Sequence, residues 1–208
     1  MIYRGVPLED LPQAHYGTIY ADPPWGFLTR SKGSVVAIPQ RAPGQHYAPM
    51  SMKDLLALPV AQVAAPDCVL HMWLISSHVE IAIQLATSWG FKFKSLGTVW
   101  VKTQKHNPEV PKMSMGFWFR QEAEIALVFT RGSPKRLDAG VRQVILEPAR
   151  EHSRKPDAGL DRVERLSAGP YLEMFSRSDR AGWDSWGDEA GKFQGHTRKT
   201  YPEVEALL

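Results

Sequence analysis

The sequence predicts an α/β fold in which helices flank a mainly parallel β-sheet. Two observations support this prediction. Short apolar runs that suit buried strands alternate along the chain with segments of helical spacing, and prolines or glycines end most of these segments. The length of 208 residues is enough to bury a single core, so we expect one domain over residues 1–208.

The first strand is expected at Tyr16–Ala21, an apolar run that ends in Asp22-Pro23-Pro24. Two successive prolines allow neither a helix nor a continuing strand ladder, so the strand must stop there. Residues 27–48 follow, with two glycines and two prolines and no sustained period. We expect a long loop, and loops of this length in compact domains usually carry function.

The next two elements are a helix and a buried strand. Ser51 has the side chain of a helix cap, and the helix that it begins must end before Pro59. Residues 68–75, from Cys68 to Ile75, form a near-continuous apolar run. Such a run is typical of a strand that is covered on both faces.

A second helix is expected after this strand. Ser76 or Ser77 can cap it, its apolar positions continue to Trp89, and Gly90 ends it. Apolar runs between turn residues then predict three further strands, at Leu96–Val101, Glu124–Thr130 and Val141–Leu146.

The last elements are a helix and a strand. Residues 157–167 have helical spacing of apolar side chains, and Gly169-Pro170 stops the helix. A final strand is expected at Tyr171–Phe175, and residues 191–208 resemble a tail.

Composition excludes several classes of protein. Hydrophobic residues make up 43% and charged residues 23% of the chain, which are ordinary globular values. No apolar run approaches the roughly 20 residues that a membrane helix needs, and the N-terminus lacks a signal peptide, so we expect a cytoplasmic protein without a membrane contact. The single cysteine, Cys68, allows neither an internal disulfide nor a zinc cluster, and we expect no metal. The net charge of +3 favours contact with polyanions only weakly.

The tetrapeptide Asp22-Pro23-Pro24-Trp25 suits chemistry on the exocyclic amino group of adenine. That nitrogen is a poor nucleophile, and it attacks a methyl sulfonium more readily when both of its hydrogens are bound by acceptors. Two groups would supply these acceptors: the Asp22 carboxylate and a main-chain carbonyl beside it that lacks a neighbouring donor. Trp25 would offer a stacking face for a flipped base. The alternative interpretation is a rigid strand exit followed by a core tryptophan.

A resemblance to a known family covers almost the whole chain. The matching segments are Ala21-Asp22-Pro23-Pro24-Trp25, His46-Tyr47-Ala48-Pro49-Met50-Ser51, Leu58-Pro59-Val60, Trp89-Gly90-Phe91, Trp100-Val101-Lys102, Gly116-Phe117-Trp118-Phe119-Arg120 leading to Glu124, His152-Ser153-Arg154-Lys155-Pro156-Asp157, Leu172-Glu173-Met174-Phe175-Ser176-Arg177 and Gly182-Trp183-Asp184-Ser185-Trp186-Gly187-Asp188-Glu189. In these segments the sequence resembles the family of the seventy-kilodalton subunit of messenger-RNA adenosine methyltransferase. That family also contains small bacterial and phage DNA adenine methyltransferases.

The resemblance implies a Rossmann-like, S-adenosylmethionine-dependent methyltransferase fold with permuted motif order. It implies that Asp22, Pro23, Pro24 and Trp25 are catalytic. It also implies a cofactor site made of Lys155, Glu173, Phe175, Arg177, Asp188 and Glu189. A cationic Lys155 suits the carboxylate of the methionine part.

Individual cofactor positions have other interpretations. Glu173 and Arg177 could form a surface ion pair, Phe175 could be core, and Lys155 could be solvated. The sequence also departs from the family in two ways. Asp188 stands where the family commonly has asparagine, and the short N-terminus offers no clear acidic contact for the cofactor adenine.

Three predicted loops are basic, and their convergence around Asp22 would form a phosphate-binding rim. The residues that we expect to contact nucleic acid are Arg30, Lys32, Arg41, His46, Tyr47, Lys102, Arg120, His152 and Arg154. The alternative is that these loops are simply solvated.

The sequence therefore predicts an enzyme that methylates the N(6) amino group of adenine in DNA by direct transfer. Cys68 lies in an apolar run and is a poor candidate for covalent catalysis. Three alternatives stay open: an RNA methyltransferase, a non-catalytic partner subunit that binds nucleic acid, and a small-molecule methyltransferase. Nothing in the sequence indicates a separate target-recognition domain, so we expect a recognition sequence that is short or relaxed, or specificity that comes from a homodimer.

Overall fold

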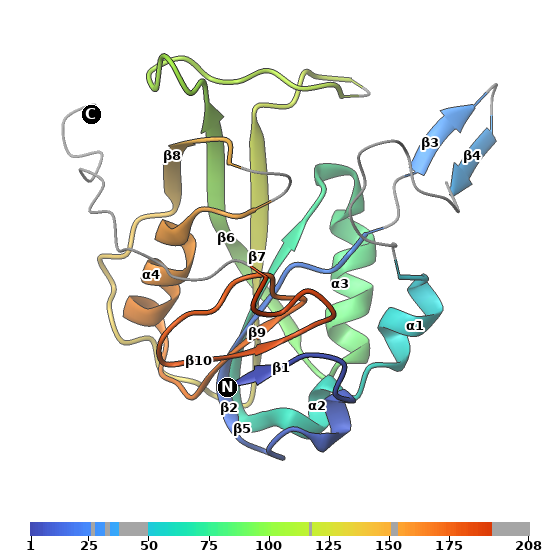
Figure 1. Cartoon of the computed structure of the whole chain (residues 1–208), viewed down its shortest axis with the longest axis vertical. Coiled ribbons are helices and arrows are strands. Elements are labelled where there is room, and N and C mark those ends of the chain that lie inside the picture. Colours follow the sequence, from blue (N-terminus) through green and yellow to red (C-terminus); the bar gives the residue numbers. More distant parts are fainter. Residues whose placement is uncertain (26–27, 32–33, 38–49, 117, 151–153, 193–208) are drawn as a thin grey trace.

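The computed structural model describes residues 1–25, 28–31, 34–37, 50–116, 118–150 and 154–192. An eight-stranded sheet forms its centre, with strand order β1-β10-β9-β2-β5-β7-β6-β8 (Figure 1). The strands are β1 (Ile2–Tyr3), β2 (Tyr16–Ala21), β5 (Ala64–Leu74), β6 (Lys92–Thr103), β7 (Ala123–Arg131), β8 (Val144–Pro148), β9 (Tyr171–Met174) and β10 (Trp183–Trp186). The helices are α1 (Met52–Ala57), α2 (Val60–Val63), α3 (Val79–Ser88) and α4 (Asp157–Leu166), with 3-10 turns η1 (Leu8–Asp10) and η2 (Ser76–His78).

The sheet is mainly parallel, as predicted. Strand β7 pairs in antiparallel fashion with both β5 and β6, whereas the other neighbouring strands of the sheet are parallel. The predicted strand at Tyr16–Ala21 has those bounds in the structure. The α/β prediction is therefore confirmed.

The prediction that residues 27–48 form an irregular loop is wrong in part. Strands β3 (Leu28–Ser31) and β4 (Ser34–Ala37) pair in antiparallel fashion as a separate two-stranded sheet. Each strand has four residues, which is too short to show a clear alternation of polar and apolar side chains.

The helix ends follow the predicted chemistry except at the start of α3. The Ser51 side chain accepts a hydrogen bond from the Asp54 backbone N–H at 3.1 Å, as an N-cap does. Gly90 has φ +86°, the left-handed conformation that ends a helix. The expected serine cap of α3 is wrong, because Ser76 and Ser77 lie in η2 and the helix begins at Val79 without a side-chain cap.

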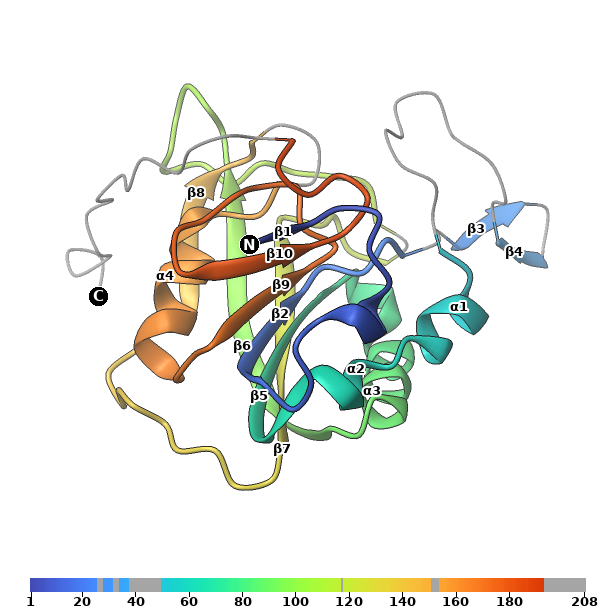
Figure 2. The same ribbon diagram turned by 60° about the horizontal axis from the view of Figure 1, so that its bottom comes forward.

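Two hydrophobic clusters lie on the two faces of the sheet. Helices α1, α2 and α3 cover one face and α4 covers the other (Figure 2). Leu70 and Met72 of β5 belong to the cluster on the first face, whereas Trp73 packs with Leu160 and Val163 of α4. This alternation along β5 is expected for a strand that is buried on both faces. Among the described residues, no helix has the length and apolar character needed to cross a membrane.

Candidate active site

Asp22 follows directly after β2, in the middle of the sheet. Strand β2 lies between the parallel strands β5 and β9, and its last residue, Ala21, is in register with Met72 and Met174. Asp22 therefore sits beyond the carboxyl ends of neighbouring parallel strands, the edge of an α/β sheet where ligands bind.

The Asp22 carboxylate is part of a network of partly buried charges. The Lys155 ammonium lies 2.9 Å from Asp22 Oδ2 and 3.1 Å from Glu124 Oε2. A second lysine, Lys102, also pairs with Glu124. The Lys155 side chain is only 13% exposed, and its ammonium lies 5.6 Å from the centre of the Trp73 ring. Lys155 is therefore not a solvated surface lysine.

Burial and charge shift the titration of this network. Burial raises the pKa of Asp22, and the Lys155 ammonium opposes this shift without cancelling it. Burial also acts to raise the pKa of Glu124, but Lys155 and Lys102 hold that pKa below its usual value. Burial lowers the pKa of Lys155, yet the two carboxylates outweigh it and the pKa is raised. Lys155 is thus a firmly protonated cation between two acids.

The expected stacking face of Trp25 is not available in this structure. The residue is 7% exposed, its indole N–H donates to the Trp73 carbonyl at 3.0 Å, and its ring packs beside His78. This corrects the prediction. A tryptophan that is buried with its N–H satisfied is a core residue, which is the alternative interpretation of the motif.

The acceptor environment of the motif also differs from the expectation. The Pro23 carbonyl accepts a hydrogen bond from the Trp25 backbone N–H at 2.7 Å, so it does have a neighbouring donor. The Pro24 carbonyl accepts from the Met50 backbone N–H at 3.2 Å. A carbonyl oxygen has two lone pairs, and Pro23 retains one of them for a ligand.

A cavity of about 330 Å³ opens beside Asp22. Its lining includes Asp22, Pro24, Phe175, Arg177, Asp188 and Glu189. The volume lies within the range of small-molecule sites. The structure thus brings together most of the residues that were predicted to bind the cofactor.

The wall of this cavity depends on an unusual backbone. Gly187 has φ +148°, and a Cβ at this position would lie 3.0 Å from the Phe175 Cα. Phe175 itself has φ +60°, and its ring packs against Trp186 with the ring centres 5.5 Å apart. A glycine is needed at position 187 because its backbone passes so close to residue 175.

A smaller cavity adjoins the first one at Asp22. It is lined by Lys155, Glu173 and Arg154 among others, and it shares Asp22, Phe175 and Arg177 with the larger cavity. Glu173 Oε2 accepts a hydrogen bond from the Ser176 hydroxyl at 2.9 Å. Lys155 and Glu173 therefore line a different cavity from Asp188 and Glu189.

The predicted nucleic-acid contacts are only partly placed. Lys102 lies in strand β6 rather than in the expected loop and pairs with Glu124, and its contact with nucleic acid stays a prediction. Arg120 is exposed and donates to the Met115 sulfur at 3.4 Å, whereas Arg154 lines the smaller cavity. Arg30 is one of the four residues of β3. The residues Lys32, Arg41, His46, Tyr47 and His152 lie outside the described part of the chain.

Glu124 is a site residue that the sequence reasoning did not single out. Glu124 is the second residue of β7. A charged residue near a strand terminus usually faces solvent, so its position alone did not indicate a site residue. Two signals were available: the family resemblance includes Glu124 in one matching segment, and the apolar run 125–129 begins directly after this carboxylate.

Comparison with known proteins adds to this geometry. The family profile described as MT-A70 matches residues 16–189. A Mycoplasma protein named type II methyltransferase M.MunI is 32% identical over 201 residues, covering 88% of this chain and 83% of that protein. A Medicago truncatula protein named putative N(6)-adenosine-methyltransferase MT-A70-like is 28% identical, covering 91% of this chain but 30% of that protein. The human N(6)-adenosine-methyltransferase catalytic subunit METTL3 is 27% identical over 78% of this chain, which spans 26% of its length.

Proposed function

Because the chain belongs to the MT-A70 family, we propose that it transfers a methyl group from S-adenosylmethionine to the N(6) amino group of adenine in DNA. The observation that carries this proposal is the position of Asp22. Its carboxylate lines both a cavity of about 330 Å³ and the smaller cavity next to it. A carboxylate that lines the larger cavity would lie beside a cofactor bound there, where it can contact a target adenine next to that cofactor.

The residues of the larger cavity fit S-adenosylmethionine. Glu189 Oε2 is buried without a hydrogen-bond partner, and a ribose hydroxyl would satisfy it. Asp188 adds a second acceptor, which serves the ribose although it lacks the amide N–H of the family's asparagine. Phe175 and Trp186 supply apolar surface for the adenine ring, and Arg177 supplies positive charge for a carboxylate. When bound, the cofactor supplies an electrophilic methyl group.

Asp22 would act on the amino group of the target adenine. Its carboxylate and the remaining lone pair of the Pro23 carbonyl can accept hydrogen bonds from the two amino hydrogens. These bonds favour a more tetrahedral nitrogen, whose lone pair is then available for attack. Asp22 must be ionised to accept in this way, and the Lys155 cation at 2.9 Å favours the ionised form.

Glu124 and Lys155 would position this carboxylate. Lys155 holds Asp22 from one side, and Glu124 fixes Lys155 by a second ion pair at 3.1 Å. Neither group then needs to touch the transferred methyl group. The high pKa of Cys68, raised to about 12 by burial, supports direct transfer without a covalent cysteine step.

DNA is favoured over RNA because the type II methyltransferase from Mycoplasma, at 32% identity, is more similar to this chain than the plant and human adenosine methyltransferases, at 28% and 27%. The chain covers 83% of the type II methyltransferase from Mycoplasma, but less than a third of the plant and human adenosine methyltransferases. The RNA alternative is supported by the names of those longer relatives. That this enzyme acts as a homodimer stays a prediction.

The test is nucleoside mass spectrometry after incubation of the protein with S-adenosylmethionine and double-stranded DNA, single-stranded DNA or RNA. N(6)-methyladenine in DNA is the expected product. Methyladenine in RNA alone would retain the chemistry and refute the DNA assignment. The absence of product on every polymer would instead favour a partner subunit without activity of its own.

A further inference from the structure

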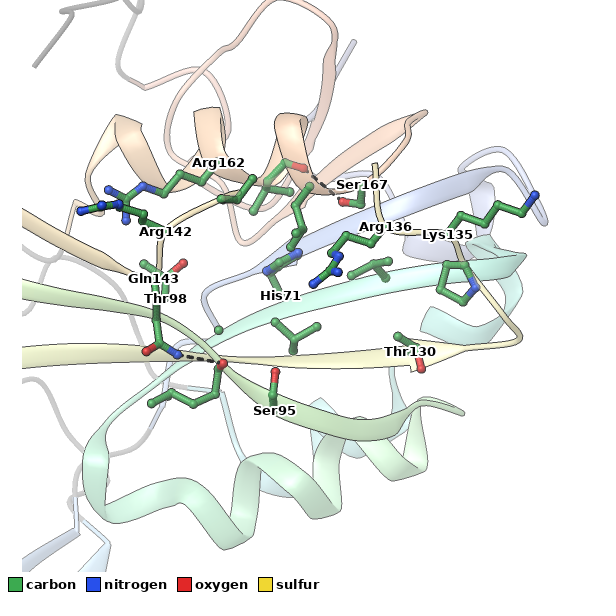
Figure 3. A pocket seen from close by; sticks show the side chains of 18 residues that line it. His71, Ser95, Thr98, Thr130, Lys135, Arg136, Arg142, Gln143, Arg162 and Ser167 are labelled. Carbon is green, nitrogen blue, oxygen red and sulfur yellow. Dashed lines mark hydrogen bonds between the residues drawn. The ribbon is translucent and has the colours of Figure 1, made fainter. Parts of the chain in front are cut away.

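A second large cavity lies away from Asp22, between helix α4 and the sheet (Figure 3). Its volume is about 340 Å³. Residues of β5, β6 and β7 form its floor, and the C-terminal half of α4 and the segment 134–143 form its other walls. It shares no lining residue with the two cavities beside Asp22. The proposed methyl transfer therefore leaves it unexplained.

His71 of β5 is the most unusual residue of this cavity. It is 3% exposed, and neither of its ring nitrogens has a hydrogen-bond partner. Figure 3 shows the ring pointing into the space beneath α4. Buried polar groups in native proteins nearly always have partners, because an unsatisfied group loses its bonds to water without replacement. A ligand that fills the cavity would satisfy this imidazole.

The chemistry of His71 limits what that ligand can be. Burial lowers the pKa of His71 to about 4, so the ring is neutral at physiological pH. A neutral imidazole has one N–H donor and one acceptor nitrogen. The two nitrogens point away from each other, so a ligand in the cavity would bond one of them, and the edge of a nucleobase carries both an acceptor for the N–H and a donor for the other nitrogen.

Basic side chains line the same cavity as this imidazole. Lys135, Arg136, Arg142 and Arg162 belong to the lining, which contains no aspartate or glutamate. In the view of Figure 3, Arg142 and Arg162 are drawn at one end of the cavity, Lys135 at the other, and Arg136 and His71 between them. Guanidinium groups match the geometry of phosphate oxygens. The positive charge of these side chains thus favours an anionic ligand in the cavity.

Apolar side chains form much of the remaining wall, among them Val69, Val128, Val163 and Leu166. They would cover the flat faces of a ring, and the volume lies in the range of sites for small organic molecules. We propose that this cavity is a binding site for a mononucleotide, with the base against His71 and the phosphate at Arg136. The site is separate from the cofactor cavity, so both can be occupied together.

Isothermal titration calorimetry with AMP, GMP, CMP and UMP tests this proposal. The titrations use the full chain saturated with S-adenosylhomocysteine, so that the cofactor cavity is blocked. We expect at least one nucleotide to bind with a Kd below about 1 mM, and about tenfold more tightly than its nucleoside or inorganic phosphate alone.

Three variants locate the binding. Arg136→Ala removes an exposed cation and should weaken the nucleotide about tenfold or more, and His71→Phe should weaken it by a similar factor. Lys94→Ala is the matched control, because Lys94 is an exposed lysine of β6 that does not line the cavity. The affinity of this variant for the nucleotide should stay within about twofold of that of the parent protein. His71→Phe should also fold at least as stably as the parent when no ligand is present, since it removes two unsatisfied nitrogens.

Three results would overturn the proposal. The first is the absence of nucleotide binding at millimolar concentration. The second is binding that Arg136→Ala leaves unchanged, which would place the nucleotide elsewhere, for example in the pocket for the target base. The third is inorganic phosphate binding as tightly as the nucleotide, which would mean a basic patch without a base pocket. Arg136 lies at the exposed mouth, so its variant keeps the test valid even if His71→Phe does not fold.

Discussion

The Lys155 ammonium contacts the Asp22 carboxylate at 2.9 Å, although 132 residues separate the two along the chain. The same ammonium lies 3.1 Å from Glu124, so one lysine bridges two partly buried acids. This pairing determines how the site responds to mutation and to pH.

Lys155→Met should destabilise the protein at neutral pH. It leaves two carboxylates close together without their shared cation, and breaking a largely buried ion pair in this way costs about 2–4 kcal/mol. It should also raise the pH at which activity appears, because the Asp22 pKa would rise further. Urea unfolding and a pH–rate profile measure the two effects. Lys155→Arg should restore most of the stability, and a Lys155→Met protein as stable as the parent would contradict the pairing.

Glu124→Gln should destabilise the protein at pH 7 and much less in acid. The pKa of Glu124 is lowered in the folded protein, so its contribution to stability is present above the unfolded value of about 4.3. That contribution is lost as the pH falls through the lower folded value. We expect the variant to lose about 1–2 kcal/mol at pH 7, with the difference shrinking below about pH 4. Equal losses at pH 7 and pH 3 would show that the effect is not electrostatic.

Glu147→Gln should have the opposite pH dependence. Glu147 of β8 is 3% exposed, and burial, with a smaller effect of Asp157, raises its pKa to about 7. The folded state therefore holds a proton that the unfolded chain releases near pH 4.3, so stability declines as the pH rises from about 4.3 to 7. The variant should be about 1–2 kcal/mol more stable than the parent at pH 8. Unfolding curves at pH 5 and pH 8 check this, and a parent protein that is equally stable at both pH values would reject the assignment.

Trp25 variants separate packing from base stacking. Trp25→Phe keeps a ring but loses the hydrogen bond to the Trp73 carbonyl, at a cost of about 1–2 kcal/mol, whereas Trp25→Ala should cost about 3–5 kcal/mol. Thermal unfolding measures both losses. If Trp25→Ala instead left stability intact and raised only the KM for DNA, Trp25 would be a stacking residue after all.

The sequence predicted what local patterns determine. The bounds of β2 followed from an apolar run that meets Pro23, and the ends of two helices followed from Ser51 and Gly90. Strands β1 and β10 escaped prediction because they have two and four residues and form through pairing at the sheet edge. An edge pairing of this kind leaves little periodic signal.

The site was predictable as a set of residues but not as a geometry. Motif positions such as Asp22 and Phe175 fell on one cavity as expected. The burial of Trp25 depends on the direction that the chain takes after Pro24, and the pairing of Glu124 with Lys155 depends on how β7 meets the segment before α4. Neither relationship leaves a trace in the local sequence, because both arise only when distant segments pack together.

The most direct test of the proposed chemistry compares the parent protein with Asp22→Asn in the transfer of labelled methyl groups to DNA. Calorimetry of S-adenosylhomocysteine binding accompanies the transfer assay. The substitution keeps the size of the side chain and leaves Lys155 paired with Glu124, so the fold and the cofactor affinity should persist. We expect transfer to fall at least about a hundredfold, because the amino group loses an anionic acceptor. Transfer by Asp22→Asn at the parent rate would contradict the central role of Asp22.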